Sequence, residues 1–293
     1  MIQFRPDQHR NPVDPHLRSK KPQKVNASLN LPLASYEFLF AYTEPLGLPP
    51  YAGSVWRGAL GWSLKRAVCV MRHTTCPNCL LYRSCVYPYV FETPPPSDAQ
   101  KMRLYPAAPH PYVLGIRSRQ AGVPYRLGLT LIGQAIRHFP YFVHALGEAG
   151  RQGLGRQRQP FELLEVRQAE GPDLAAWRTV YAPDHPLSLA RVSGPQWPPA
   201  PERLTLRLET PLRLKREERL VVPPRFRFDD LFANLLRRLS LLSYFHTDQS
   251  LEVDFAALIE QARAVPIHDP HLEWYDWTRY SSRQDRLMHM GGL

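Results

Sequence analysis

Apolar residues in the first half of the chain follow two spacings, one typical of strands and one typical of helices. Residues 34–42 partly alternate apolar and polar positions, and residues 125–132 and 161–166 also predict strands. Apolar residues recur every three or four positions in residues 54–70, and residues 134–146 predict a second helix. This β-α-β-β-α-β order, with one strand of the middle pair not located, predicts a ferredoxin-like domain.

The second half of the chain begins with the same order of a strand and then a helix. Residues 203–208 alternate as a strand does, and residues 229–245 carry the pattern of a long amphipathic helix. Two such starts predict an α+β fold with tandem ferredoxin-like domains. The proline-rich residues 193–201 predict the boundary, so we expect domains at residues 31–192 and 200–293.

All four cysteines of the 293-residue chain fall within 17 residues, as Cys69-x6-Cys76-x2-Cys79-x5-Cys85. A CxxC pair presents two thiolates to one ion, and the two flanking cysteines complete a tetrahedral set. The spacing predicts a metal-binding insertion at residues 69–90, with structural Zn²⁺ as the first choice and a [4Fe–4S] cluster as the alternative. A disulfide is less favoured, because the chain lacks an apolar secretory leader and the rest of it avoids cysteine, as in a reduced cytoplasmic protein.

The net charge of the chain indicates which class of molecule it binds. The chain has 37 Lys+Arg against 26 Asp+Glu, a formal net charge of +11, and most of the cations are arginines. This balance predicts a polyanionic partner such as nucleic acid, although a merely basic surface is the alternative. Residues 1–30 are polar and basic, which predicts a disordered arm that contacts RNA or a partner, or else a terminus without a role. No run of about 18 apolar residues occurs, so we expect no membrane span.

A glycine- and arginine-rich stretch follows the second predicted helix, at residues 147–158. Its four glycines would let backbone N–H groups approach phosphates, and its arginines would supply charge. The alternative is a flexible hairpin without a ligand. The arginines of this candidate RNA-binding turn are Arg151, Arg156 and Arg158.

Four segments, taken in their order along the chain, resemble the Cas6 family of CRISPR RNA-processing endoribonucleases. They are LPPYAGSVWRGALG at residues 48–61, YPAAPHPYV at 105–113, GLGR at 153–156 and WTRYSSRQ at 277–284. The resemblance covers residues 33–293 and points to the branch with a four-cysteine knuckle after the first helix. It implies two ferredoxin-like domains of the RAMP type, related to RRM folds, that bind the repeat hairpin of precursor crRNA in a prokaryotic cytoplasm.

The reaction that the resemblance implies needs no catalytic metal. A ribose 2′-OH attacks the adjacent phosphate, leaving a 2′,3′-cyclic phosphate and a 5′-OH. This chemistry requires a general base, a general acid and a cation for the phosphorane. Other Cas proteins of an effector complex are further expected partners.

Two features depart from the pattern of the family. Trp62 stands where relatives often place a histidine or tyrosine on the first helix, and an indole N–H cannot accept a proton. Relatives also continue past Gly291-Gly292-Leu293 into a final strand and a second glycine-rich loop. We therefore expect the second domain to be incomplete, either because the protein is shortened or because a partner adds a strand.

The candidate catalytic residues are His73, His110 and Lys65. His73 lies in the knuckle, where some relatives place a catalytic histidine, but it is also a plausible solvated loop residue. His110 is fixed between two prolines, and its alternative is a hydrogen-bonded residue at the entry of a strand. Lys65 and Arg57 lie two turns apart on the first helix, where both reach one phosphate or simply face solvent.

The aromatic and basic tail predicts a clamp for single-stranded RNA. Its candidate RNA-binding residues are Arg279, Tyr280, Arg283 and Arg286, and the alternative is a strand with an exposed basic side. Three functions are consistent with the sequence as a whole: a cleaving endoribonuclease, a non-catalytic subunit that holds the crRNA hairpin in an effector complex, and a zinc-knuckle DNA-binding protein. The first is favoured.

Overall fold

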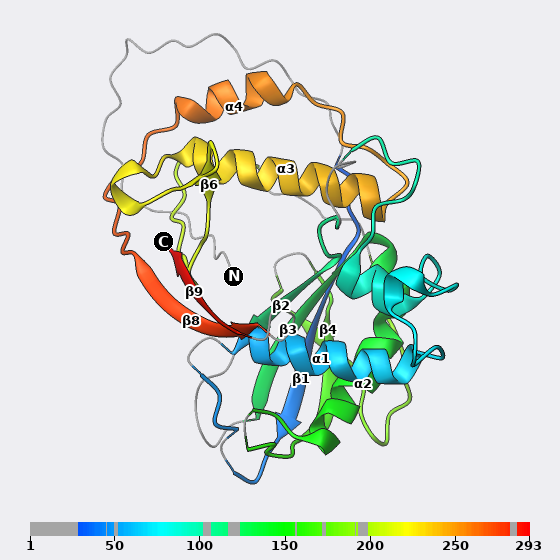
Figure 1. Ribbon diagram of the computed structural model, residues 1–293. Helices are drawn as coiled ribbons and strands as arrows, with labels where there is room; N and C mark the ends of the chain where they lie inside the picture. The colour runs from blue at the N-terminus through cyan, green and yellow to red at the C-terminus, as the bar shows by residue number, and fades with distance from the viewer. Residues whose placement is uncertain are drawn as a thin grey trace. The chain divides into compact units, whose positions relative to one another are not determined.

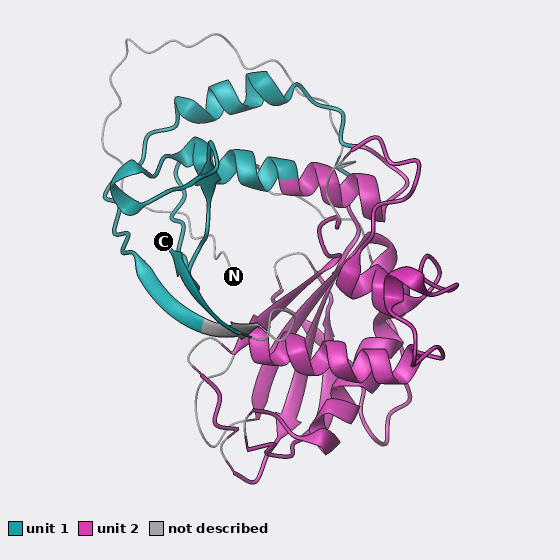
Figure 2. Cartoon of the chain, viewed as in Figure 1, with its two compact units in different colours: residues 1–29, 197–237, 251–293 teal, residues 30–196, 238–250 magenta. Residues whose placement is uncertain are grey.

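A computed structural model gives the fold of the chain. It describes residues 29–44, 46–49, 52–101, 107–116, 124–155, 157–171, 174–190, 192, 199–281 and 286–293. The chain divides into two compact units, drawn in different colours in Figure 2. Unit 1 comprises residues 1–29, 197–237 and 251–293, and unit 2 comprises residues 30–196 and 238–250.

Unit 2 contains a five-stranded antiparallel sheet with the strand order β2-β3-β1-β4-β5. Figure 1 shows these strands side by side, with helix α1 lying across them. The elements of this unit are β1 (Leu33–Ala41), α1 (Gly53–Val68), η1 (Cys76–Asn78), η2 (Pro88–Glu92), β2 (Tyr112–Ile116), β3 (Tyr125–Ile132), η3 (Gly133–His138), α2 (Phe139–Gln152), β4 (Glu162–Ala169) and β5 (Trp177–Tyr181).

Aromatic side chains join the sheet to its two helices. Alternate residues of β1 point to one face, where Tyr36 stacks on Phe139 of α2 with ring centroids 3.8 Å apart. On the same face Phe40 stacks on Trp56 of α1 at 5.1 Å. The buried rings belong to a single core cluster, so α1 and α2 are fixed on one face of the sheet by burial of large apolar surface.

The predicted elements of the first half are present with shifted ends. The strand predicted at residues 125–132 has those bounds as β3, and the missing middle strand is β2 (Tyr112–Ile116). The helix predicted at residues 134–146 begins as the 3-10 helix η3, and α2 then continues to Gln152. The strand β5 at the edge of the sheet had no counterpart in the prediction.

Unit 1 differs more from the prediction. It contains the two-residue strands β6 (Lys215–Arg216) and β7 (Arg219–Leu220), η4 (Pro223–Arg225), residues 228–237 of α3 (Phe228–His246), α4 (Phe255–Arg263) and the hairpin of β8 (Tyr275–Ser281) with β9 (Arg286–Gly292). The strand predicted at residues 203–208 is wrong, because within the described parts of the chain these residues pair with no strand. Leu206 and Leu208 instead pack against a small core around Leu214 and Val221, which explains their alternation.

The described chain is therefore a mixed α+β structure. Its first half has the element order β-α-β-β-α-β followed by an edge strand, whereas the described second half has only two-stranded sheets. None of the helices in the described parts of the chain is both long enough and apolar enough for a membrane span.

The last turns of α3 are anchored in unit 2 at a glycine. Gly133 has a φ of +57°, and a Cβ at this position would lie 2.0 Å from the backbone oxygen of His246. Gly133→Ala should therefore lower the free energy of unfolding by about 2 kcal/mol or more, because both the backbone conformation and the contact oppose a side chain.

The matched control is Gly58→Ala on the exposed side of α1, where a Cβ meets no atom within 4 Å. Alanine has the higher helix propensity, so this control should raise stability by about 0.5–1 kcal/mol. Thermal unfolding followed by circular dichroism checks both variants. Equal midpoints for the two alanine variants would contradict the close approach at Gly133.

Candidate functional site

The exposed face of α1 carries two cations that lie over aromatic rings of the following segment. The Lys65 ammonium lies 5.3 Å from the centroid of the Tyr87 ring, and the Arg57 guanidinium lies 5.2 Å from that of Phe91. The two rings are stacked at 5.4 Å. Between the cations, Gly61 leaves room for the ring of Phe91, since a Cβ there would lie 2.7 Å from a ring carbon. The glycine thus lets η2 lie directly against α1.

The segment η2 is a π-helix that ends at a residue in an unusual conformation. Thr93 has φ 45° and ψ 55°, in the left-handed region. This conformation costs a β-branched residue roughly 1–3 kcal/mol, and such strain is concentrated at functional sites. Backbone hydrogen bonds from Thr93 N to Pro88 O and from Ala108 N to Thr93 O hold it in place. The side chain of Thr93 is buried, at 4% exposure.

His110 lies between Thr93 and Arg57. Its Nδ1 is 2.8 Å from Thr93 Oγ1, and its Nε2 is 3.3 Å from Nη2 of Arg57. The imidazole also stacks on Tyr112 at a centroid distance of 6.0 Å. His110 therefore contacts residues of three segments. These are α1, the end of η2 and the start of β2. His110 is a hydrogen-bonded residue at the entry of a strand and is also joined to a predicted phosphate-binding cation.

Burial first, and then the positive charges of Arg57 and Arg238 and the nearby His246, lower the pKa of His110 from 6.5 to about 4. A lowered pKa keeps the imidazole neutral at physiological pH. A neutral imidazole accepts a proton, and the neighbouring guanidinium attracts an anion. The cluster therefore combines a proton acceptor with a cation, which are two of the three groups that phosphodiester cleavage by a 2′-OH requires.

A second histidine lies beneath this cluster and is fully enclosed. His246 of α3 is 1% exposed, and its Nε2 lies 2.8 Å from Pro109 O. Its Nδ1 lies 3.1 Å from the hydroxyl of Tyr89. Because both ring nitrogens have partners and the ring is buried, His246 joins α3 to the segment that leads into His110.

The other predicted catalytic residues lie apart from His110. His73 is exposed in the loop between α1 and η1, and Lys65 is exposed on α1. Within the described residues neither side chain forms a hydrogen bond to His110. Of the predicted groups, the structure therefore brings together His110 and Arg57.

The glycine-rich stretch is mostly not a turn. Gly147 and Gly150 lie inside α2, and Arg151 in its last turn pairs with Glu148. The interpretation of all four glycines as one phosphate-binding turn is wrong, because the helix continues to residue 152. In the remaining turn Leu154 N and Gln159 N donate to each other's carbonyl oxygens, so these amides are not available to a phosphate. Arg158 is exposed in the turn, and Arg156 lies outside the described residues.

The tail forms the hairpin of β8 and β9. Arg279 and Tyr280 are on β8, opposite Met288 and Leu287 of β9. The side chains of Arg279 and Tyr280, and the whole of Arg283, lie outside the described part of the structure. Arg286 is exposed at the start of β9. The predicted clamp is thus a strand pair, and among its candidate residues the structure describes the side chain of Arg286.

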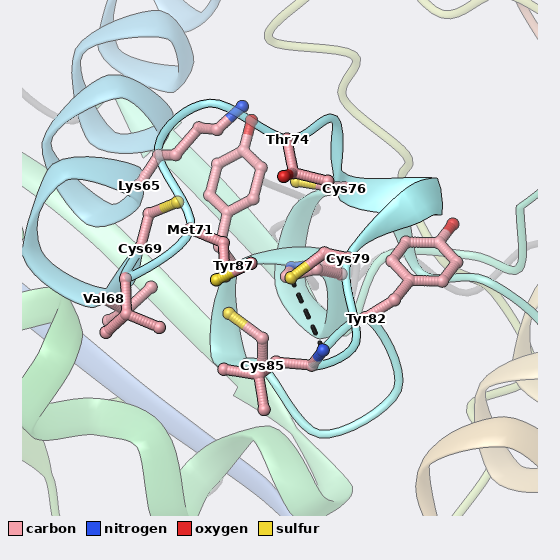
Figure 3. A pocket seen from close by; sticks show the side chains of 13 residues that line it. Lys65, Val68, Cys69, Met71, Thr74, Cys76, Cys79, Tyr82, Cys85 and Tyr87 are labelled. Atoms are coloured by element: carbon pink, nitrogen blue, oxygen red, sulfur yellow. Dashed lines mark hydrogen bonds between the residues drawn. The ribbon is translucent and has the colours of Figure 1, made fainter.

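All four cysteines line one small pocket at the far end of α1. Cys69, Cys76, Cys79 and Cys85 share it with Lys65 and Tyr87, and Figure 3 shows the thiols of Cys79 and Cys85 pointing into the same space. The thiols form no disulfide. Leu81 N donates a backbone hydrogen bond to Cys79 Sγ over 3.4 Å.

The donor set fits a thiophilic ion in kind. Four soft sulfur ligands in one pocket suit Zn²⁺ or an iron–sulfur cluster. No group of three or more histidine, cysteine, aspartate or glutamate side chains among the described residues already has the spacing of a metal site. Burial, and secondly the Glu92 carboxylate, raise the pKa of Cys76 to about 11, so this thiol favours its protonated form unless a cation offsets those effects.

Two residues of the His110 cluster were missed by the sequence analysis. Thr93 lies in a proline-rich connection, and nothing local marks its hydroxyl as a partner of His110. Arg238 lies on α3, 128 positions after His110 in the sequence, and acts on it through charge. Only the packing of α3 against the first half brings this arginine into the cluster.

The buried histidines make stability depend on pH. Burial lowers the pKa of His246 from 6.5 to about 4. The unfolded chain therefore takes up a proton first as pH falls, so the stabilisation is complete above about pH 6.5 and is lost toward about pH 4, by up to about 3 kcal/mol. His246→Gln should flatten this dependence in thermal unfolding between pH 7 and 4, leaving the part due to His110.

The control is His144→Gln, because His144 is exposed on α2. It should keep the pH dependence of the wild type. A His246→Gln variant whose unfolding midpoint falls with pH as steeply as that of the wild type would contradict the assignment.

A family profile and a relative each match part of the chain. The sequence profile of the AF_1859_N family, described as an N-terminal domain, matches residues 31–192. An uncharacterized protein of Archaeoglobus fulgidus is 24% identical over 141 residues, which is 48% of this chain and 48% of the relative, so the match spans about half the length of that relative. No solved structure matches the chain. Because the profile covers more than half of the 293 residues, the chain belongs to the AF_1859_N family.

Proposed function

We propose that this protein binds the repeat hairpin of precursor crRNA and cleaves it by metal-independent attack of a 2′-OH. The observation that carries the proposal is the cluster of a neutral histidine and an exposed arginine at the end of a strained segment, namely His110, Arg57 and Thr93. The β-α-β-β-α-β order of residues 33–169 supports a ferredoxin-like interpretation of the first domain.

In this proposal His110 is the general base. Its imidazole takes the proton of the attacking 2′-OH, and Arg57 stabilises the charge that develops on the phosphate. Arg238 adds positive charge near the same point. Water or another group of the chain supplies the proton to the leaving 5′-oxygen.

The surface around the cluster suits RNA. Arg57, Lys65 and Arg66 are exposed on α1. Trp62 is 49% exposed, and the Arg66 guanidinium lies 4.6 Å from its ring centroid. Cations for phosphates and an exposed indole for stacking are the groups that single-stranded RNA requires. With a net charge of +11, we expect the affinity to fall steeply with salt.

A second function is favoured by one feature of the same cluster. A base with a pKa of about 4 is weak, and general-base catalysis is most efficient when the pKa lies near the working pH. A non-catalytic subunit that holds the crRNA hairpin with other Cas proteins, in a prokaryotic cytoplasm, would need the arginines but not the histidine. Cleavage assays separate the two functions.

His110→Ala should lower the single-turnover rate on cognate repeat RNA by about 10²–10⁴ while the RNA affinity stays nearly unchanged. His73→Ala is the matched control, since it removes an exposed histidine of the knuckle and should cut at the wild-type rate. All reactions should proceed in EDTA and leave a 2′,3′-cyclic phosphate.

The wild-type rate should fall as pH decreases through about 4, because protonated His110 cannot accept a proton. Wild-type cutting by His110→Ala would refute the assignment of the base. Tight hairpin binding by a wild type that never cuts would support the holding subunit.

For the knuckle we propose structural Zn²⁺ held by Cys69, Cys76, Cys79 and Cys85, with a [4Fe–4S] cluster as the alternative. The presence of all four thiols in one pocket supports this assignment. Elemental analysis of purified protein should find about one zinc per chain, and Cys76→Ser should reduce it about 10-fold or more.

Met71→Leu is the control for that experiment, because Met71 lines the same pocket without supplying a thiolate. It should keep the metal. Iron with a brown colour would decide for the cluster, and protein without either metal would exclude both.

A further inference from the structure

We propose that Thr93 is a positioning residue that fixes the tautomer of His110, so that the unprotonated Nε2 faces Arg57 and the RNA. The inference about the tautomer concerns the protein alone. Its consequence for cleavage depends on the proposed function. The argument uses the donor and acceptor capacity of the three side chains around the ring.

The contact with Arg57 indicates which ring nitrogen carries the proton. A guanidinium has only N–H donors and no acceptor. Nη2 of Arg57 lies 3.3 Å from Nε2 of His110, so Nε2 must offer its lone pair. In a neutral imidazole the proton is then on Nδ1.

The Thr93 hydroxyl oxygen accepts the hydrogen bond from this Nδ1–H. Nδ1–H donates to Thr93 Oγ1, 2.8 Å away, and the Thr93 hydroxyl donates in turn to Val90 O at 3.4 Å. In this series of hydrogen bonds Arg57, His110 and Thr93 each donate one. The opposite tautomer would direct an N–H of the ring at an N–H of Arg57 and leave two donors facing each other, which costs the free energy of a lost hydrogen bond.

The strained backbone explains why a threonine can hold the ring. Thr93 is 4% exposed, and its backbone N–H and C=O bond to Pro88 and Ala108. Ala108 is two residues before His110, so the hydrogen bond from Ala108 N to Thr93 O holds the backbone of Thr93 close to that of His110. Left-handed conformations held by surrounding structure are typical of residues that preorganise a site.

The fixed tautomer places the lone pair where a substrate arrives. Arg57 is exposed, so a 2′-OH entering from solvent can replace its contact with Nε2. The 2′-OH proton then transfers to Nε2, giving an imidazolium whose Nδ1–H still bonds Thr93. The new O2′–P bond forms, the P–O5′ bond breaks, and the 5′-oxygen takes a proton from water and leaves as a 5′-OH. Arg57 is released to bind the phosphate.

Two threonine variants separate the hydroxyl from the shape of the side chain. Thr93→Val keeps the branched shape and removes the hydroxyl, whereas Thr93→Ser keeps the hydroxyl. Thr130→Val is the matched control, because Thr130 also loses a part-buried hydroxyl contact, to Ser35 Oγ at 3.2 Å, but within the sheet.

The first measurement is the ¹⁵N spectrum of the His110 ring in protein without RNA, assigned through the loss of its signals in His110→Ala. We expect Nδ1 protonated and Nε2 unprotonated at pH 7 in the wild type, in Thr93→Ser and in Thr130→Val. Thr93→Val should give a mixture of tautomers. Nε2 protonation in the wild type overturns the proposal whether or not the protein cleaves RNA.

The second measurement is the single-turnover rate and its dependence on pH. Thr93→Val should cut about 10- to 100-fold more slowly with unchanged RNA affinity, and Thr93→Ser should recover most of the rate. An unchanged tautomer and rate in Thr93→Val would overturn the proposal. If the wild type has the expected tautomer but never cuts, the proposed function fails and the role of Thr93 in holding His110 stands. If Thr93→Val does not fold, the wild-type spectrum and the Thr93→Ser rate decide.

Discussion

The close approach of η2 to α1 at Gly61 is the contact on which the candidate site depends. A side chain at Gly61 would meet the ring of Phe91, so the absence of one allows Phe91 and Tyr87 to lie under the cations Arg57 and Lys65. The same approach places the end of η2, and with it Thr93, beside the helix that carries Arg57. The cluster around His110 can form because the backbone of η2 approaches that of α1 closely at Gly61.

Burial and charge act on His110 in the same direction. The ring is desolvated, and the positive charges of Arg57 and Arg238, together with His246 once that ring is protonated, disfavour a further positive charge. The His110 ring is therefore neutral at physiological pH, but it is a weaker base than a solvent-exposed histidine. In the proposed function, an anionic phosphate bound at Arg57 would offset part of the positive charge that lowers the pKa of His110.

The cysteine pocket lies at the other end of the same pair of elements. Cys69 directly follows α1, and Cys85 lies three residues before η2. The hydrogen bonds of Tyr89 N to Cys85 O and of Cys69 N to Lys65 O continue these two elements into the knuckle. The proposed ion, bound by both cysteines, would join the end of α1 to the segment before η2, and its role would then be structural rather than chemical.

The sequence alone determined the elements with strong periodicity and the residue types of the site. It located β3 and α1, and it named His110, Arg57 and the four cysteines, because local spacing and side-chain chemistry are visible in one dimension. It failed at residues 203–208, since alternation cannot reveal whether a partner strand is available, and at residues 147–152, where a helix continued through glycines. Only the tertiary structure decided that Thr93 and Arg238 join His110, because contacts between distant segments depend on packing and on a strained backbone that no local pattern encodes.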